Sequence, residues 1–174
     1  MNYKTSLLVL LLIAAYLVTP TYSFAQAKYV GSKVCGMCHK SEKQGLQLKI
    51  WSESSHAQAY KVLLTPKADE IAKAKGGKKA IETPACLKCH VGDEALVASA
   101  FKEDGVQCET CHGAGSEYKA MPVMKNKAEA VKKGLIVPEG AKSCVTCHNS
   151  ESPTFKGFKY EEMWKKIAHA TPKG

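Results

Sequence analysis

The sequence predicts a mainly α-helical protein built from short helices and loops. Three observations lead to this fold class. No stretch of useful length alternates apolar and polar residues, as a half-buried strand would. Proline and glycine interrupt the chain at short intervals, so each helix must be brief; examples are Thr65-Pro66, Gly76-Gly77, Thr83-Pro84, Ser152-Pro153 and Thr171-Pro172. Large apolar side chains are few for the chain length, while one short cysteine-containing segment is repeated four times.

All eight cysteines belong to four Cys-x-x-Cys-His motifs, which we number 1 to 4 in chain order. They are Cys35–His39, Cys86–His90, Cys108–His112 and Cys144–His148. This spacing is typical of covalent c-type haem attachment, in which two thiols one helical turn apart form thioethers and the histidine ligates iron. We expect four covalent haems, bound through Cys35, Cys38, Cys86, Cys89, Cys108, Cys111, Cys144 and Cys147, with proximal ligands His39, His90, His112 and His148. The fold class is then an irregular multihaem cytochrome c, with short helices and loops wrapped around four packed haems.

Two other interpretations of the cysteines were weighed. An exported chain with eight cysteines can form four disulfides, and two Cys-x-x-Cys pairs can bind zinc. Neither explains why histidine follows the second cysteine in all four motifs, when the chain has six histidines in total. Motifs 2 and 3 are so close in sequence that we expect their haems to be neighbours.

Residues 1–27 have the pattern of a secretory signal peptide. Lys4 is the positive residue, Leu7 to Val18 is a short apolar run, and Ala25-Gln26-Ala27 is a small-x-small cleavage site. The apolar run is too short for a comfortable membrane span, although an uncleaved anchor stays an alternative. We expect one tetrahaem domain at 28–174, exported to the periplasm or the extracellular space, with no membrane span in the mature chain.

The chain has a formal charge of +9, and its 25 basic residues are all lysines. A basic protein invites a nucleic-acid interpretation. Export and the absence of arginine, whose planar guanidinium reads bases and phosphates, argue against it. The carboxylates of four haems would also offset most of the positive charge. We therefore expect redox partner proteins and no nucleic acid.

Apolar periodicity and helix stop signals predict the individual elements. Between Ser41 and Leu64 the pattern is helical, with His56, Ala59, Tyr60 and Leu63 on one face. Further helices are expected over 66–75, from 126 to a stop at Gly134, and over 160–168. Residues 91–107 are expected to be a linker, and Gly113 and Gly115 to let the backbone pass close to a haem face.

Two segments beside the motifs carry a resemblance to a known family. One reads Trp51-Ser-Glu-Ser-Ser-His56-Ala, and the other, Gly105 to Gly115, surrounds motif 3. With the four motifs they make the chain similar to the cytochrome c-554 family. The resemblance implies a mainly α-helical, exported electron-transfer protein with closely packed haems. It also implies that His56 is a distal haem ligand.

Each iron has two axial positions, so four irons need more ligands than six histidines supply. His56 and His169 are the candidate distal ligands. Homo-oligomerisation cannot change the ratio of histidine to iron. The candidates for the remaining positions are a methionine (Met121, Met124 or Met163), a lysine, or no protein ligand, which leaves an open iron. We therefore predict that at least one iron is not coordinated by two histidines.

The sequence favours an electron carrier over an enzyme, because everything that a carrier requires is visible. Lysines 73, 75, 78 and 79 would steer such a carrier toward acidic partners, or they form an ordinary solvated face. One alternative is a small haem reductase acting on a nitrogen oxide at an open iron, for which Glu109 and Glu117 are the nearest acidic residues in sequence. Another is a subunit of a conductive cytochrome filament. The oligomeric state is left open.

Overall fold

The structure is a computed structural model in which residues 26–169 are described. Within that range every regular element is an α-helix or a 3-10 helix, and no strand occurs. The mainly α-helical prediction is confirmed. The predicted signal peptide, except for its last two residues, lies outside the described range. No helix within 26–169 is long and apolar enough to cross a membrane.

The helices are short. In chain order they are α2 (Ser32–Gly36), α3 (Gln47–Ser52), α4 (Ala59–Val62), α5 (Pro66–Ala74), α6 (Pro84–His90), α7 (Glu94–Val97), α8 (Cys108–His112), α9 (Met121–Met124), α10 (Lys127–Lys132) and α11 (Tyr160–Ile167). Five 3-10 helices lie between them: η1 (Glu42–Gln44), η2 (Ser55–Gln58), η3 (Ala80–Glu82), η4 (Lys102–Asp104) and η5 (Cys144–Thr146).

Three predicted helices are confirmed, and local capping explains two of their starts. α5 begins with Pro66, and the Thr65 side chain accepts a hydrogen bond from the Ala68 amide at 3.3 Å. α10 begins after Asn126, whose side chain accepts from the Glu129 amide at 3.1 Å. α11 covers the predicted segment over 160–168 except for its last residue.

The prediction of one helical segment between Ser41 and Leu64 is wrong in its continuity. The segment is divided into η1, α3, η2 and α4. Leu46 has a left-handed backbone (φ 55°) and Ser54 is extended, and each interrupts the helical hydrogen-bond ladder. The predicted apolar face partly survives, because Tyr60 and Leu63 are buried.

The linker expected over 91–107 also contains more structure than predicted. It holds α7 and η4. The Asp93 side chain caps α7 by accepting a hydrogen bond from the Leu96 amide at 2.9 Å. This capping residue is visible in the sequence, and only the shortness of the helix concealed it.

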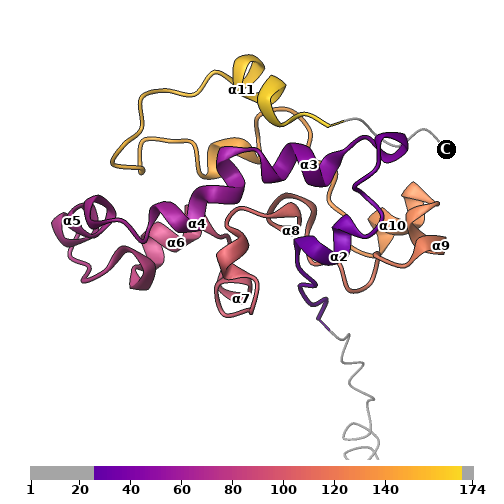
Figure 1. Ribbon diagram of the computed structural model, residues 1–174, viewed down its shortest axis with the longest axis horizontal. Coiled ribbons are helices and arrows are strands. Elements are labelled where there is room, and N and C mark those ends of the chain that lie inside the picture. The colour runs from indigo at the N-terminus through magenta and orange to yellow at the C-terminus, as the bar shows by residue number, and fades with distance from the viewer. Residues whose placement is uncertain (1–25, 170–174) are drawn as a thin grey trace, which may run out of the picture.

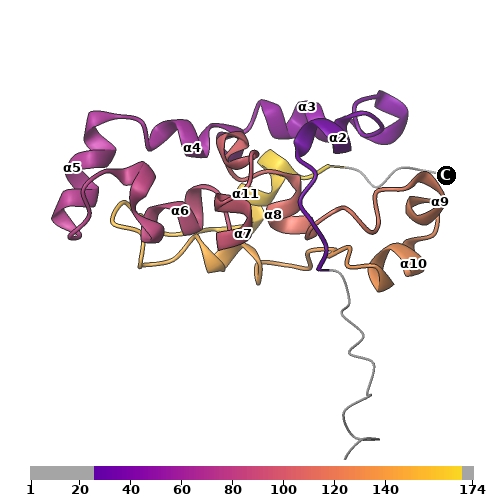
Figure 2. The same cartoon turned by 90° about the horizontal axis from the view of Figure 1, so that it is seen from below.

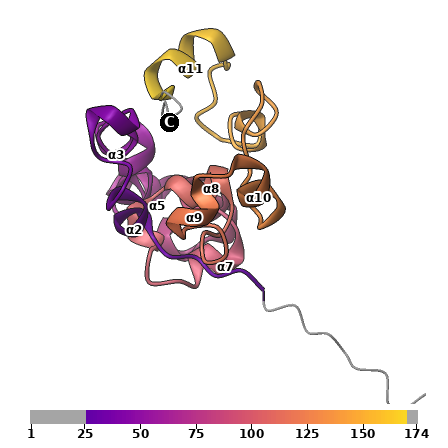
Figure 3. The ribbon, with the colours of Figure 1, turned by 90° about the vertical axis from the view of Figure 1, so that its right-hand side faces the viewer.

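The helices are arranged along one long axis (Figure 1). α5 and α6 lie at one end, α8 lies near the middle with α2 beside it, and α9 and α10 lie at the other end. The view from below shows the same order along the axis (Figure 2). α11 follows a long connection and stands apart from the rest when the molecule is seen end-on (Figure 3).

The hydrophobic core is small and sits at the α5–α6 end. Tyr60, Leu63, Leu87, Val91 and Leu96 form it together with two alanines, so α4 to α7 share one cluster. No residue from 131 to 169 is buried. Over residues 131–169 the protein therefore lacks buried apolar side chains, which are the usual source of folding free energy.

Candidate haem-binding site

Each motif lies on a helical turn, which brings its two cysteines to the same side. In motif 1 the Cys38 amide donates to the Cys35 carbonyl at 3.2 Å, and the His39 amide donates to the same carbonyl at 3.0 Å. Motif 4 repeats this pattern, with 3.2 Å from Cys147 and 2.9 Å from His148 to the Cys144 carbonyl. Motifs 2 and 3 are contained in α6 and α8.

Cysteines of different motifs meet in a definite pattern. The Cys35 thiol of motif 1 and the Cys108 thiol of motif 3 are neighbours, and this neighbour together with burial raises the pKa of Cys108 well above its ordinary value. Burial raises the pKa of Cys89 to about 11, and the neighbouring Cys147 thiol adds to the shift. Cys111 also lies within electrostatic range of the motif 4 thiols. Motif 3 therefore borders motifs 1 and 4, and motif 4 borders motif 2.

Motifs 2 and 3 are joined by one hydrogen bond, whereas the expectation that their haems are neighbours stays a prediction. The hydroxyl of Thr110, a residue of motif 3, donates a hydrogen bond at 3.0 Å to the carbonyl of Val91, the residue that directly follows motif 2. The cysteine contacts follow another order, as described above.

Two of the motif histidines are oriented by main-chain carbonyls. His90 Nδ1 lies 2.7 Å from the Ala59 carbonyl oxygen, and His112 Nδ1 lies 2.9 Å from the Ile136 carbonyl oxygen. A carbonyl oxygen can only accept, so Nδ1 carries the proton in each neutral ring. The lone pair is then on Nε2, which is the arrangement that a metal-bound histidine requires.

The other two histidines of the chain each face a motif histidine. The ring centroids of His56 and His148 are 6.0 Å apart, and those of His112 and His169 are 5.9 Å apart. Metal–imidazole bonds of about 2 Å on both sides of one metal ion place two ring centroids roughly 6 Å apart. Both pairs thus leave the space that one iron with two axial imidazoles needs.

Burial favours the neutral imidazole form, which is the form that binds iron, in the two candidate distal ligands. Burial lowers the pKa of His56, and the neighbouring His148 lowers it further. Burial likewise lowers the pKa of His169, with contributions from His112 and His39. Phe158 stacks on the His148 ring, with centroids 4.8 Å apart and planes 17° apart, and so limits its rotation.

His56 is held in place by the second segment that resembles the cytochrome family. The Val106 amide donates to the His56 carbonyl at 3.1 Å, and the Trp51 indole donates to the Val106 carbonyl at 2.8 Å. Gly105 has φ +73°, and a Cβ there would lie 2.6 Å from the His56 carbonyl oxygen. The two segments therefore pack against each other, and the glycine is required for that approach.

Replacing Gly105 by alanine is expected to displace His56 and to lower the thermal unfolding temperature of the holoprotein. The added Cβ meets backbone, which cannot rotate away, and the Gly105 backbone (φ 73°, ψ −142°) lies in a region essentially restricted to glycine, which costs alanine about 1–3 kcal/mol. Optical and electron paramagnetic resonance (EPR) spectra should show partial conversion of one low-spin iron to high-spin. Gly140→Ala is the control, because Gly140 also has a positive φ but meets nothing within 4 Å. A Gly105→Ala spectrum identical to the control would contradict the packing argument.

Large apolar side chains are exposed around the motifs, as expected where a porphyrin covers them. Met37 is 68% exposed and Leu64 is 60% exposed. α11 has no buried residue, although Tyr160 and Trp164 stack on one side of it with centroids 6.0 Å apart. These surfaces fit a large apolar cofactor.

The two alternatives for the cysteines find no support in the described residues. All eight cysteines are unpaired thiols. No group of three or more histidine, cysteine or acidic side chains within 26–169 is arranged to hold a metal ion by itself. The donor set of thiol pairs followed by histidine fits haem.

His39 and His90 are not in ring contact with another histidine, and all six histidines lie within the described range. Gln47 interacts with the His39 side chain. Of the predicted methionine candidates, Met121 is 60% exposed and Met163 is 38% exposed.

Sequence reasoning missed the residues that orient the histidines. Ala59 and Ile136 act through main-chain carbonyls and carry no side-chain signal. Phe158 contacts motif 4 across a proline- and glycine-containing loop. Glu109 was considered as a possible acid, but it is 1% exposed and accepts hydrogen bonds from several donors, so it is not available to a substrate. Gly113 approaches the Gly134 carbonyl and Gly115 approaches the Glu109 carboxylate, so protein atoms account for both glycines.

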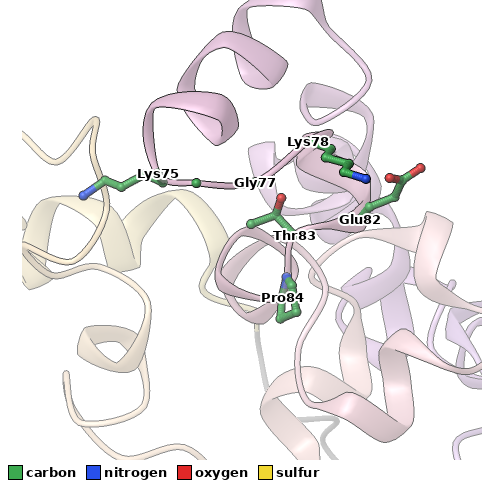
Figure 4. A pocket seen from close by; sticks show the side chains of 7 residues that line it. Lys75, Gly77, Lys78, Glu82, Thr83 and Pro84 are labelled. Carbon is green, nitrogen blue, oxygen red and sulfur yellow. The ribbon is translucent and has the colours of Figure 1, made fainter.

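A surface pocket of about 310 Å³ lies where α5 ends, close to motif 2 (Figure 4). Its lining comes from Lys75, Gly76, Gly77, Lys78, Glu82, Thr83 and Pro84. The Lys75 and Lys78 side chains point away from each other, so they do not converge on one ligand.

Comparisons with known proteins agree with this geometry. Residues 34–113 match the family model described as cytochrome c554 and c-prime, and residues 99–153 match a doubled CXXCH motif. Cytochrome c-554 of Nitrosomonas europaea is 26% identical over 196 residues, covering 90% of this chain and 81% of that protein. The chain is a c-type cytochrome resembling cytochrome c-554. No solved structure matches it.

As a multihaem c-type cytochrome, the protein binds haem iron covalently through its Cys-x-x-Cys-His motifs and acts in electron transfer with redox partners. The cytochrome c554 match spans motifs 1 to 3 and both segments around His56 and Gly105. The doubled-motif match spans motifs 3 and 4, whose thiols lie within electrostatic range of each other.

Proposed function

We propose that this cytochrome is an exported four-haem electron carrier, with a cleaved signal peptide at 1–27 and one tetrahaem domain at 28–174. The observation that carries the proposal is the row of motifs along the molecule: cysteines of motifs 1 and 3, and of motifs 4 and 2, are neighbours, and a motif 3 cysteine lies within electrostatic range of the motif 4 thiols. Such contacts place the attachment points of successive haems next to each other. The proposed order is 1–3–4–2, and it agrees with the positions of α2, α8 and α6 along the long axis.

Each haem has a proposed set of ligands. The cysteine pairs hold the haems, and His39, His90, His112 and His148 bind the irons on the proximal side. His56 is the proposed distal ligand at motif 4, and His169 is the proposed distal ligand at motif 3. The centroid distances of 6.0 and 5.9 Å support these two pairings. The irons of motifs 1 and 2 then have a non-histidine sixth ligand or an open position.

Haem iron supplies one-electron oxidation and reduction when it is bound. The chain contributes the geometry. The carbonyls of Ala59 and Ile136 hold the His90 and His112 rings, and Phe158 holds the His148 ring. Fixed ligands keep the change in structure between the two oxidation states small, which is what a carrier needs.

The lysines near motif 2 provide positive charge that would attract redox partners to this end of the row of motifs. Lys73, Lys75, Lys78 and Lys79 surround the end of α5, and none of them belongs to an ion pair within residues 26–169. They would attract an acidic redox protein at rates that fall with salt. The neighbouring Lys88 is paired with Glu151 at 3.6 Å.

A second candidate function is reduction of a nitrogen oxide at the iron of motif 1 or 2. The lack of a facing histidine at His39 and His90 favours it. The two acidic residues considered for this reaction do not favour it, because Glu109 is buried and hydrogen bonded at both oxygens and Glu117 is exposed on the surface. The carrier is therefore the better-supported function.

The mature protein, expressed with a haem-attachment system, is expected to carry four haems and to take up four electrons in a reductive titration. Mass spectrometry would count the haem additions on a chain that begins near Gln26 or Lys28. Nitrite, nitric oxide and hydroxylamine should not be turned over with an artificial donor. Fewer than four haems would end the tetrahaem proposal, and sustained turnover would favour the reductase.

A further inference from the structure

Glu109 lies between the two cysteines of motif 3 in the sequence, and its carboxylate is buried. Glu109 is 1% exposed, and both of its oxygens accept hydrogen bonds. The amides of Val30 (3.0 Å), Gly31 (2.8 Å) and Gly115 (2.7 Å) donate to it, as does the Gln107 side-chain amide (3.0 Å). None of the ion pairs within residues 26–169 includes Glu109. Its negative charge is therefore compensated by dipoles alone.

The surrounding backbone is shaped for this carboxylate. Gly31, which precedes α2, has φ +84°, and a Cβ on Gly115 would lie 3.0 Å from Glu109 Oε1. The donors come from the segment before motif 1, from the start of motif 3 and from the loop after motif 3. Burying a carboxylate is costly unless it is hydrogen bonded at several points. The arrangement therefore joins the two motifs at one charged side chain.

The charge lies where the haem-binding cysteines of two motifs meet. Cys35 and Cys108 contact each other, and Glu109 interacts electrostatically with both thiols. A charge in a low-dielectric interior acts on its neighbours far more strongly than a charge in water. Reduction removes one positive charge from an iron, so a nearby buried anion favours the oxidised state. Burial and local polarity are among the factors that set haem potentials.

We propose that Glu109 is a positioning residue that fixes motif 1 against motif 3, and that its buried charge lowers the reduction potentials of the two haems attached there. The proposal rests on the four-haem function above. The Glu109 carboxylate makes the haems of motifs 1 and 3 harder to reduce than they would be in its absence. Electrons would then be drawn from that end toward motifs 4 and 2.

The test is a spectroelectrochemical titration of the full-length holoprotein carrying Glu109→Gln. Two of the four potentials are expected to rise, while the other two stay at their wild-type values. His169→Ala in the same background would mark the motif 3 iron by its high-spin signal and identify one of the shifted haems. Glu117→Gln is the matched control, because it removes the same charge from an exposed carboxylate near motif 3. Its potentials should not change.

Gln107→Met is a second variant, for which the expected shift in the two reduction potentials has the opposite sign. It leaves the carboxylate in place and removes one of its donors, with little change in volume, so the same two potentials should fall. Unchanged potentials in Glu109→Gln, or an equal rise at all four haems, would overturn the proposal and leave a structural role only. If Glu109→Gln does not mature, the sign of the Gln107→Met shift decides. Haem counting by mass is separate from both shifts, so a failure of the four-haem function would be recognised independently.

Discussion

Replacing His56 by alanine is expected to convert one of the four irons, that of motif 4, from low-spin to high-spin. The His56 and His148 rings face each other with centroids 6.0 Å apart, and no other histidine contacts the His148 ring within residues 26–169. Removing one imidazole leaves that iron with a single strong axial ligand. The measurement is EPR of the oxidised protein, together with carbon monoxide binding by the reduced protein.

The covalent haem should survive in this variant, because Cys144, Cys147 and His148 are unchanged, and mass spectrometry would check it. His169→Ala is the matched variant, in which the iron of motif 3 should convert instead. A double variant should convert two irons. A low-spin signal that is unchanged in His56→Ala would mean that His56 is an ordinary side chain on the η2–α4 segment.

The chain without haems is expected to lack a cooperative fold. The longest helix within residues 26–169 has nine residues, and isolated helices shorter than roughly 12–15 residues are marginal in water. The buried apolar residues include several alanines and cluster at one end. Circular dichroism of a variant with all eight motif cysteines replaced by alanine should show largely unfolded chain and no cooperative thermal transition.

The motifs should differ in how much of the fold depends on the haem that each one binds. Removing the motif 4 cysteines should expose residues 131–169 to hydrogen exchange, because nothing in that range is buried in the protein itself. Removing the motif 2 cysteines should leave more protection, because Leu87 and Val91 belong to the hydrophobic cluster. Equal protection in the two variants would show that protein packing, and not haem, holds the C-terminal part.

The local features of this protein could be predicted from the sequence because each depends on residues within one or two helical turns. Two thiols and a histidine at fixed spacing indicate haem attachment wherever they lie in the fold. Thr65-Pro66 and Asn126 mark helix starts by the same short-range chemistry. His56 could be identified as a candidate ligand, since it lies on the face shared with Tyr60.

The pairing of distant segments was decided by tertiary structure alone. His56 follows motif 1 in the chain but faces His148 of motif 4, and Glu109 reaches back to the amides of Val30 and Gly31. Motifs 2 and 3 are closest in sequence, yet the cysteine contacts link motif 1 to 3 and motif 2 to 4. The path of the loops brings these partners together, and main-chain donors and acceptors complete the contacts. Because every residue carries the same backbone groups, no residue type in the sequence marks where those contacts will form.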